Sequence, residues 1–341
     1  MDRREFLKNS ALASFSTGSL FPSTHFTEHE EYTPLRIGLC ADLHQDLIPD
    51  APGRLSAFID EMEEKKPDFI IQLGDFCQPS PQNKEVMDIW NRFSGPKYHV
   101  MGNHDPEGDF TQDEVVDFWK AEGTYYSFDM KGYHFVVLNG NEQNPEHDTP
   151  WKYERYISDI QRDWLKNDLR TTDLPVIVFC HQGLDNDEYG IENAMRVRLI
   201  LERANKAAGF RKVQIVFSGH HHQDYHNVIN GIHYIQINSM SYHWQGNKYA
   251  ESPFGKKLNE KYSLLKYMAH YQDPLWAIVD ISSDGMLRLH GRKSSFIGKS
   301  PAELGMPPYE HAYPVVPYIS DKKIQLSQRI FRAGGKDAKG K

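Results

Sequence analysis

Apolar residues occur along the chain in two spacings, which predict an alternation of strands and helices. Short runs rich in β-branched residues predict buried strands at 35–40, 69–73, 98–101, 176–180 and 213–218. Longer stretches with apolar residues at helical spacing predict helices at 54–66, 84–93, 157–169 and 192–208. This order of elements is typical of an α/β protein.

Hairpins add a second kind of β-structure to this pattern. Residues 125–130 and 133–139 are separated by Lys131 and Gly132, a spacing that predicts a β-hairpin. Further strands are predicted at 232–238, 276–281 and 286–289. Alternating elements combined with hairpins favour two sheets packed face to face, with helices on the outer faces.

Side chains that can bind metal follow five of the predicted strands. They are Asp42, His44, Asp75, Asn103, His181, His220 and His222. Strands that end at one edge of a sheet can direct such residues to a common point. The mixture of oxygen and imidazole donors suits borderline divalent ions such as Mn, Fe or Zn. Because these donors exceed the need of one four-coordinate ion, the simplest interpretation is a hydrolase with two ions that share a carboxylate.

The same positions carry a resemblance to a known family. The segments Asp42-Leu43-His44, Gly74-Asp75, Gly102-Asn103-His104-Asp105, His181 and Gly219-His220-His221-His222 resemble, in order, the signature blocks of the calcineurin-like metallophosphoesterases. The resemblance implies a four-layer α/β/β/α sandwich of two mixed β-sheets flanked by helices. It covers residues 35–222, and we expect the domain to continue to residue 293.

The resemblance also implies a role for each residue. Asp75 would bridge the two divalent ions, and a hydroxide between the ions would attack phosphorus. The remaining ligands would divide into two sets, Asp42, His44 and His222 for one ion and Asn103, His181 and His220 for the other. His104 would donate a proton to the leaving group, and Asp105 could fix the tautomer of His104. Strand-like alternation would turn His221 away, so we leave it out of the site.

The substrate is less constrained than the reaction. Residues 76–81 contain neither the Arg of protein serine/threonine phosphatases nor the Tyr of purple acid phosphatases. We therefore expect a small phosphodiester or phosphomonoester as substrate. The alternatives are a nucleotide or nucleotide-sugar pyrophosphatase and, in a different class, a non-catalytic metal-binding scaffold.

Residues 239–273 are rich in aromatic side chains and predict a cap over the site. Tyr242, His243 and Trp244 follow the strand after the last ligands, so they are candidates for substrate contact, with ordinary packing as the alternative. We expect the tail, residues 294–341, to wrap the surface or to fray.

Composition restricts the class of partner. The 341 residues are 39% hydrophobic and carry a formal net charge of −8, which argues against non-specific binding of nucleic acid. The sequence contains no apolar run long enough to span a membrane, and it does not constrain the oligomeric state. Cys40, Cys77 and Cys180 each lie within two positions of a proposed ligand. We interpret them as small buried residues, with thiolate ligation as the alternative.

The N-terminus predicts export. Residues 2–8 resemble the signal read by the twin-arginine export machinery, and a weakly apolar run follows at 11–21. A disordered N-terminus with an accidental pair of arginines is the alternative. We therefore expect residues 1–34 to be signal peptide and linker, and the exported protein to be periplasmic.

Overall fold

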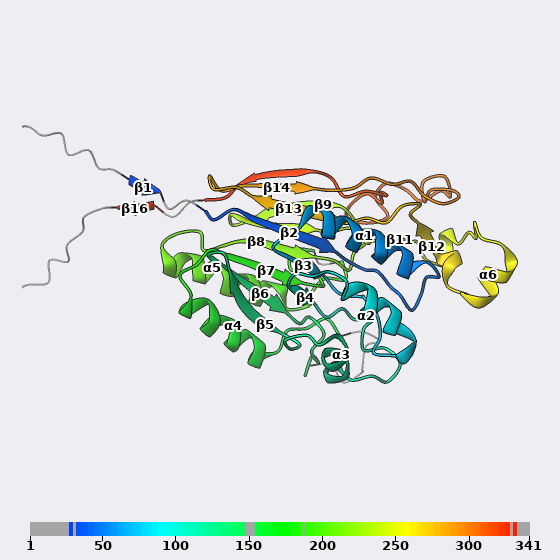
Figure 1. Ribbon diagram of the computed structural model, residues 1–341, viewed down its shortest axis with the longest axis horizontal. Coiled ribbons are helices and arrows are strands. Elements are labelled where there is room, and N and C mark those ends of the chain that lie inside the picture. The colour runs from blue at the N-terminus through cyan, green and yellow to red at the C-terminus, as the bar shows by residue number, and fades with distance from the viewer. Residues whose placement is uncertain (1–26, 30–31, 147–153, 187, 328–329, 333–341) are drawn as a thin grey trace, which may run out of the picture. The chain divides into compact units, whose positions relative to one another are not determined.

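The computed structural model describes residues 27–29, 32–146, 154–186, 188–327 and 330–332 (Figure 1). The proposed signal peptide lies outside these residues, as does the centre of the loop at 139–156. Two compact units are present. In one of them β1 (Thr27–His29) pairs antiparallel with β16 (Ile330–Arg332). All other elements belong to the second unit, residues 31–329, which contains the candidate site.

The first six-stranded sheet has the order β15-β14-β13-β2-β3-β4. Its parallel part consists of β2 (Leu35–Cys40), β3 (Phe69–Gln72) and β4 (Lys97–His99). Antiparallel strands extend the sheet on the other side of β2, and they are β13 (Ala277–Ile281), β14 (Met286–His290) and β15 (Lys322–Gln325). The strands β2, β3 and β4 therefore end at the same edge.

The second six-stranded sheet has the order β5-β6-β7-β8-β10-β9. Its central strands run parallel, and they are β6 (Tyr133–Leu138), β7 (Val176–Cys180), β8 (Val213–Ser218) and β10 (Ile232–Gln236). The flanking strands β5 (Tyr126–Met130) and β9 (Tyr225–Ile229) are antiparallel to their neighbours. The predicted hairpin is confirmed as β5 and β6.

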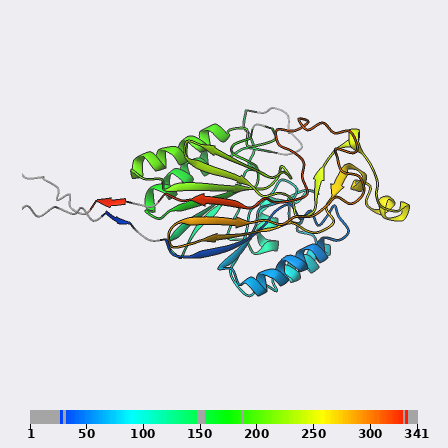
Figure 2. The ribbon, with the colours of Figure 1, turned by 90° about the horizontal axis from the view of Figure 1, so that it is seen from above.

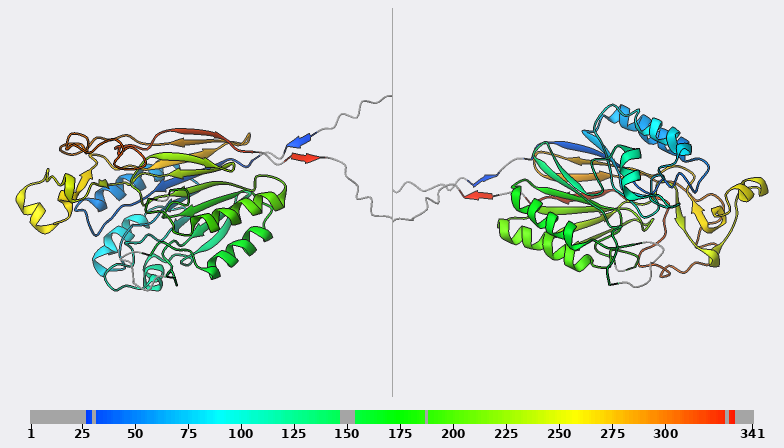
Figure 3. Two further views of the ribbon diagram at one scale, coloured as in Figure 1. Left: turned by 180° about the vertical axis from the view of Figure 1, so that it is seen from behind. Right: turned by 90° about the horizontal axis from the view of Figure 1, so that it is seen from below.

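Helices cover the outer face of each sheet. The first sheet packs against α1 (Ala51–Lys65) and α2 (Lys84–Trp90), the latter preceded by a 3-10 turn at Pro81–Asn83. The second packs against α4 (Asp159–Thr171) and α5 (Ala194–Ala208), which lie side by side (Figure 3). Seen from above, the blue helix α1 and the green helices α4 and α5 lie on opposite sides of the two sheets (Figure 2). The four-layer α/β/β/α sandwich is confirmed.

Aromatic rings fill the space between the two sheets. Phe69, Phe135, Phe179 and Phe217 are fully buried there. The rings of Phe135 and Phe179 are stacked with centroids 6.1 Å apart, and those of Phe179 and Phe217 are 5.8 Å apart. Burial of such rings contributes on the order of 2–3 kcal/mol each, so this core fixes the position of one sheet against the other.

The predicted cap, residues 239–273, contains a second two-stranded antiparallel pair, β11 (Tyr242–Trp244) and β12 (Met268–His270). Between these strands the chain forms short helices, which are η2 (Asn247–Tyr249), α6 (Lys256–Lys261) and η3 (Leu265–Tyr267). The yellow α6 marks the cap in Figure 1. No helix in the part of the chain described by the structure is both long and apolar enough to cross a membrane.

Some elements are absent from the sequence prediction. Helix α3 (Gln112–Trp119) begins at a capping box, in which Thr111 accepts from the N–H of Glu114 and the Glu114 carboxylate accepts from the N–H of Thr111. Strand β15 lies in the tail for which the sequence predicts wrapping of the surface or fraying, and no strand. It pairs with β14 because Ile324 and Leu326 bury their side chains in the core between the sheets. The domain limits at 35, 293 and 294 remain predictions.

Candidate metal centre

The seven proposed ligands all follow strands that end at one edge of the two sheets. Asp42 and His44 follow β2, Asp75 follows β3, Asn103 follows β4, His181 follows β7, and His220 and His222 follow β8. Five of these residues have a positive φ, namely Asp42, His44, Asp75, His220 and His222, with values between 50° and 74°. A left-handed backbone at a residue other than glycine costs about 1–3 kcal/mol and is concentrated at functional sites. The backbone is therefore strained at the edge of the sheets where the predicted ligands lie.

One set of donors consists of Asp42, His44 and His222, whose ligand atoms lie within 4.8 Å of one another. The Nε2 atoms of His44 and His222 are 3.1 Å apart, and Nε2 of His222 is 3.2 Å from Oδ1 of Asp42. All three side chains are buried. This is the set that the sequence assigned to one ion.

A second set consists of Asp75, His181 and His220. Nδ1 of His181 donates to the carbonyl oxygen of Leu73 over 2.7 Å, which leaves Nε2 of the ring 3.2 Å from Oδ2 of Asp75. The same Oδ2 is 3.6 Å from Nε2 of His44. Asp75 therefore lies between the two sets, where a bridging carboxylate would be required.

The donor sets fit a pair of divalent ions. Several imidazole nitrogens converge on each set together with a carboxylate, an arrangement that a cation can stabilise. Asn103, the remaining predicted ligand, is buried, and its Oδ1 has no hydrogen-bond partner among the described residues. An unpaired buried amide oxygen is unfavourable unless it binds a cation or a donor. The residues thus suit the divalent ions expected from the sequence, and they do not distinguish between Mn, Fe and Zn.

The glycines of two motifs are needed for close approach. Gly74 has a φ of +100°, and a Cβ at this position would overlap the ring of His181. A Cβ at Gly102 would overlap the backbone nitrogen and the carboxylate of Asp75. Both positions accept glycine alone because ligand residues of neighbouring strands pack directly against the backbone.

Burial and neighbouring charges set the protonation of the cluster. Burial lowers the pKa of His44 and of His220 well below the usual value, which favours the neutral ring that a metal requires. Burial alone would raise the pKa of Asp75, but His181, His104 and His44 outweigh it and hold the pKa well below its usual range.

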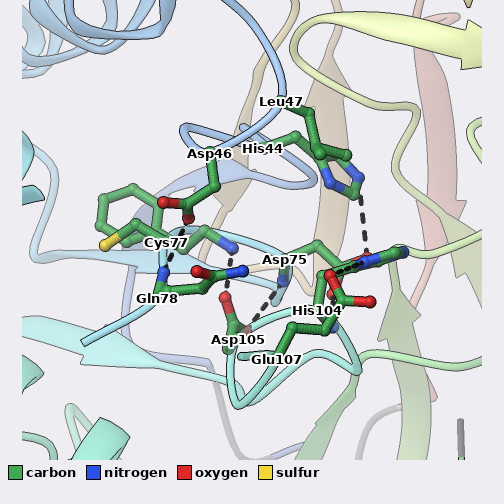
Figure 4. A pocket seen from close by; sticks show the side chains of 10 residues that line it. His44, Asp46, Leu47, Asp75, Cys77, Gln78, His104, Asp105 and Glu107 are labelled. Atoms are coloured by element: carbon green, nitrogen blue, oxygen red, sulfur yellow. Dashed lines mark hydrogen bonds and ion pairs between the residues drawn. The ribbon is translucent and has the colours of Figure 1, made fainter. Parts of the chain in front are cut away.

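The carboxylate next to Nδ1 of His104 belongs to Glu107 and not, as predicted, to Asp105. Oε2 of Glu107 lies 2.9 Å from Nδ1 of His104, so Glu107 rather than Asp105 holds this ring (Figure 4). Glu107 follows His104 by three residues in a turn closed by a backbone hydrogen bond, which brings the two side chains together. Burial alone would lower the pKa of His104, but Asp75 and Glu107 outweigh it and raise the pKa. The short spacing of His104 and Glu107 was the one sequence signal for this pair.

Asp105 instead organises the backbone beneath the ligands. Its carboxylate accepts from the N–H groups of Asp75, Phe76 and Gly102 over 2.7–3.0 Å. Figure 4 shows the contact with Asp75. The side chain is buried. Asp105 therefore joins the ends of β3 and β4, whose ligands are Asp75 and Asn103.

Two further expectations concern residues next to the ligands. His221 lies outside both donor sets, but not through strand alternation, because β8 already ends at Ser218. Nε2 of its ring contacts the carbonyl oxygen of Glu188 over 2.8 Å. Cys40, Cys77 and Cys180 are buried, and burial raises the pKa of each thiol, so they remain protonated and pack as small apolar groups.

A cavity of about 750 Å³ opens beside the donor sets. Tyr242, His243 and Trp244 all line it, as the sequence suggested for substrate contact. Tyr242 is buried with its ring 5.1 Å from that of His44, and Nδ1 of His243 is 3.0 Å from the carbonyl oxygen of His222. Trp244 is 44% exposed, so it is the one of the three that presents a free surface.

Other residues that line the cavity were missed because none of them lies in a motif, and some come from distant segments. They are Glu188, Gln223, Gln245, Lys248, Met306, Glu310 and His311. His104 lies close enough to His44 and Asp75 to form a third group of donors, so its role as a proton donor remains a prediction.

A sandwich of two mixed sheets with carboxylate, amide and imidazole donors at its strand ends is typical of metal-dependent hydrolases. Comparison with known proteins identifies the class more closely. The family model for calcineurin-like phosphoesterases matches residues 35–224, and this chain belongs to that family. It is thus a phosphoesterase hydrolase of a family that depends on a dinuclear metal site, which opposes the scaffold alternative.

Two relatives illustrate the relationship. The chain is 22% identical over 266 residues to a 3′,5′-cyclic-nucleotide phosphodiesterase of Nostoc sp., an alignment that covers 72% of this chain and 91% of the relative. Among solved structures it is similar to a dimetal phosphatase from Danio rerio, with a TM-score of 0.56 and 15% identity. That match covers 78% of this chain and 99% of the other, and it supports the fold.

Proposed function

We propose that this metal-dependent phosphoesterase hydrolyses small phosphodiesters in preference to phosphomonoesters. The observation that carries the proposal is the cavity of about 750 Å³ beside the donor sets, which has room for an organic group on each side of the phosphate. Lys248 is the only Lys or Arg among the described residues that line this cavity. A monoester dianion would gain from additional cationic side chains, whereas a diester carries a single negative charge. The name of the Nostoc relative supports the same class of substrate.

The site residues have three different roles, which are metal binding, proton donation and positioning of the backbone. Two divalent ions (Mn, Fe or Zn), when bound by the seven ligands, would neutralise phosphate charge and activate water. His104 would donate a proton to the departing alkoxide from Nε2, because Glu107 engages Nδ1. Asp105 would keep Asp75 and Gly102 in place through their backbone N–H groups.

A substrate panel tests the proposal. The purified protein is stripped with a chelator, reloaded separately with Mn, Zn or Fe, and assayed on bis(p-nitrophenyl) phosphate, p-nitrophenyl phosphate, cyclic nucleotides and dinucleotide pyrophosphates. We expect the diesters to have the highest kcat/KM with the preferred metal. A higher kcat/KM for the monoester with every metal would overturn the diester assignment, and higher activity on the pyrophosphates would favour the nucleotide pyrophosphatase alternative.

We also propose that the enzyme acts after twin-arginine export, in the periplasm. The support is the arginine pair Arg3 and Arg4 with the following Phe6, Leu7 and Lys8. Arg3→Lys together with Arg4→Lys should retain active precursor in the cytoplasm, as measured by cell fractionation. Unchanged export of the double variant would remove this proposal.

A further inference from the structure

The part of the cavity away from the metal ligands has a distinctive chemistry. We define the outer wall as Glu188, Gln223, His243, Gln245, Lys248 and Glu310, all of which line the cavity. These residues come from four separate parts of the chain, which are the segment after β7, the segment after β8, the residues around β11 and the tail before β15. None of them belongs to the donor sets.

Negative charge predominates along the cavity. Among the described residues that line it, Glu107, Glu188 and Glu310 contribute three carboxylates and Lys248 contributes one ammonium group, which leaves two formal negative charges apart from the ligand Asp75. Nζ of Lys248 lies 3.1 and 3.2 Å from the carboxylate oxygens of Glu310, so these two charges largely offset each other and Glu188 supplies the remaining negative charge of the outer wall. A second phosphate or a carboxylate on the substrate would meet repulsion here.

The Glu188 carboxylate is held in place by the tail. It accepts from the N–H of Ala312 over 3.1 Å, and its Oε1 is 3.2 Å from Nδ1 of His311. The same residue contacts Nε2 of His221 through its carbonyl oxygen. Its negative charge is therefore fixed between the tail and the loop that carries the ligands of β8.

Hydrogen-bond acceptors also predominate on the outer wall. Gln223, His243 and Gln245 are at least 93% buried, and Oε1 of each glutamine and Nε2 of the histidine have no partner among the described residues. Nδ1 of His243 faces the carbonyl oxygen of His222, which can only accept, so Nδ1 carries the proton and Nε2 of the neutral ring is an acceptor. Three unpaired buried acceptors call for a ligand that supplies N–H or O–H donors.

An apolar surface lies beside these acceptors. Trp244 is 44% exposed and its ring lies 5.8 Å from that of Tyr267, which also lines the cavity. An indole face can cover an alkyl chain and attracts a nearby cation. The wall thus combines carboxylates, acceptors and an aromatic face.

We propose that the outer wall binds the organic group of a phosphodiester that carries a protonated amine. An ammonium group supplies both the positive charge that the carboxylates favour and the N–H donors that Gln223, His243 and Gln245 lack. The inference rests on the proposed phosphodiesterase function and narrows its substrate class. It also disfavours nucleoside diphosphate esters, because their additional phosphate would lie against the carboxylates.

Matched chromogenic substrates test the charge preference. One series consists of p-nitrophenyl phosphodiesters with 2-aminoethyl, 4-aminobutyl or 6-aminohexyl groups, so that the reach of the chain is sampled. Each is paired with the alkyl ester in which a methyl group replaces the ammonium, and with the corresponding carboxylate. We expect at least one amine to exceed its alkyl partner in kcat/KM by about fivefold or more, and the carboxylates to be the poorest substrates. Salt should reduce the ratio of amine to alkyl ester.

Two variants that remove charges of opposite sign test whether the outer wall causes the preference for the amine. Glu310→Gln should lower the ratio of amine to alkyl ester, and Lys248→Gln should raise it, each by about two- to fivefold. Glu251→Gln is the matched control, because this cap residue pairs with Lys299 and does not line the cavity, so the ratio should not change. Since both test residues are surface groups whose ion pair is exposed, folded protein is expected, and metal content checks it.

The outcomes separate the two proposals. If the alkyl esters are hydrolysed as well as the amines at every chain length, the inference is wrong while the phosphodiesterase function stands. If the ratio is high but changes in neither Glu310→Gln nor Lys248→Gln, the outer wall is not its source and the inference is equally wrong. If the metal-loaded protein hydrolyses none of these diesters, nor bis(p-nitrophenyl) phosphate, the proposed function itself fails.

Discussion

The two ends of the cavity are built in different ways. At the inner end, the ligands follow five parallel strands, and their positions are fixed by backbone contacts such as those of Asp105 with Asp75 and Gly102. At the outer wall, side chains from loops, cap and tail meet through ion pairs that are partly exposed, as between Lys248 and Glu310. The inner end is therefore rigid in its backbone, whereas the outer wall depends on individual side chains.

This difference assigns chemistry and specificity to different parts of the molecule. Substitution of a metal ligand at the inner end should remove metal and activity on every substrate, because the strained backbone accommodates few alternatives. A substitution on the outer wall should change which ester is preferred while the metals stay bound. Changes at the inner end have the largest expected effects.

The largest effect is expected for Asp75→Asn. Oδ2 of Asp75 lies near Nε2 of both His44 and His181, so its charge serves both donor sets. The asparagine variant should lose most of both ions, as measured by elemental analysis of the purified protein, and its activity should fall below detection. If two ions per chain remained bound, Asp75 could not be the bridge.

His104→Ala should have a smaller effect that depends on the leaving group. General acid catalysis is typically worth about 10²–10⁴-fold, so hydrolysis of alkyl diesters should fall by that order while metal content is retained. A p-nitrophenyl ester should lose less, because its leaving group departs without a proton.

His220→Ala is the contrasting variant at the inner end. His220 belongs to a donor set, so its loss should reduce metal content and the rates on alkyl and p-nitrophenyl esters together. If His104→Ala also lost metal, and lost the same factor in rate on both esters, His104 would be a metal ligand. That result is compatible with its closeness to His44 and Asp75, so the measurement is decisive.

The inner end could be predicted from sequence because the same local pattern recurs at each strand. A buried β-rich run followed by a polar residue specifies a position at the edge of a sheet, as for Val176–Cys180 followed by His181. The order of these runs then specifies which ligands meet. Asp105 and Glu107 show the limit of this reasoning, because a turn of three residues decides which carboxylate reaches His104.

Only part of the outer wall could be predicted. His243 was a candidate for substrate contact, but Glu188 and Glu310 reach the wall through long-range packing. Glu188 reaches His311 across more than a hundred residues, and neither lies in a motif. Strand β15 was missed for a related reason. Its pattern is short and charged, and only the burial of Ile324 against the other sheet strands makes it a strand.

Lys322→Met tests how the tail holds the outer wall. Nζ of Lys322 in β15 lies 2.8 Å from Oδ1 of Asp224, and both side chains are at most 7% exposed. Removal of one partner from a buried pair leaves an uncompensated charge and costs about 3–5 kcal/mol. The free energy of unfolding in urea should fall by about that amount. Lys323→Met, on the exposed face of the same strand, is the control and should change it by less than about 0.5 kcal/mol.

The same variant sharpens the comparison of the two ends. The tail between β14 and β15 carries Glu310 and His311, so a loosened β15 should reduce the ratio of amine to alkyl ester before it reduces metal content. If Lys322→Met instead lost metal while the ratio of amine to alkyl ester stayed unchanged, Lys322 would act on the inner end, through Asp224 and the neighbouring His222.

An effect smaller than that of His104→Ala is expected for Glu107→Gln, which lies where the two ends meet. The glutamine side chain can still accept from Nδ1 of His104 through its amide oxygen, but it no longer carries the charge that stabilises the protonated ring. Hydrolysis of alkyl diesters should fall by about three- to thirtyfold, with metal content and p-nitrophenyl ester hydrolysis nearly unchanged, and the loss should be absent when His104→Ala is already present. Asp105→Asn is the contrasting variant, because an amide cannot accept from three backbone N–H groups as the carboxylate does, so metal content should fall. If instead Glu107→Gln lost metal and Asp105→Asn lost only the leaving-group effect, the roles of the two carboxylates beside His104 would be reversed.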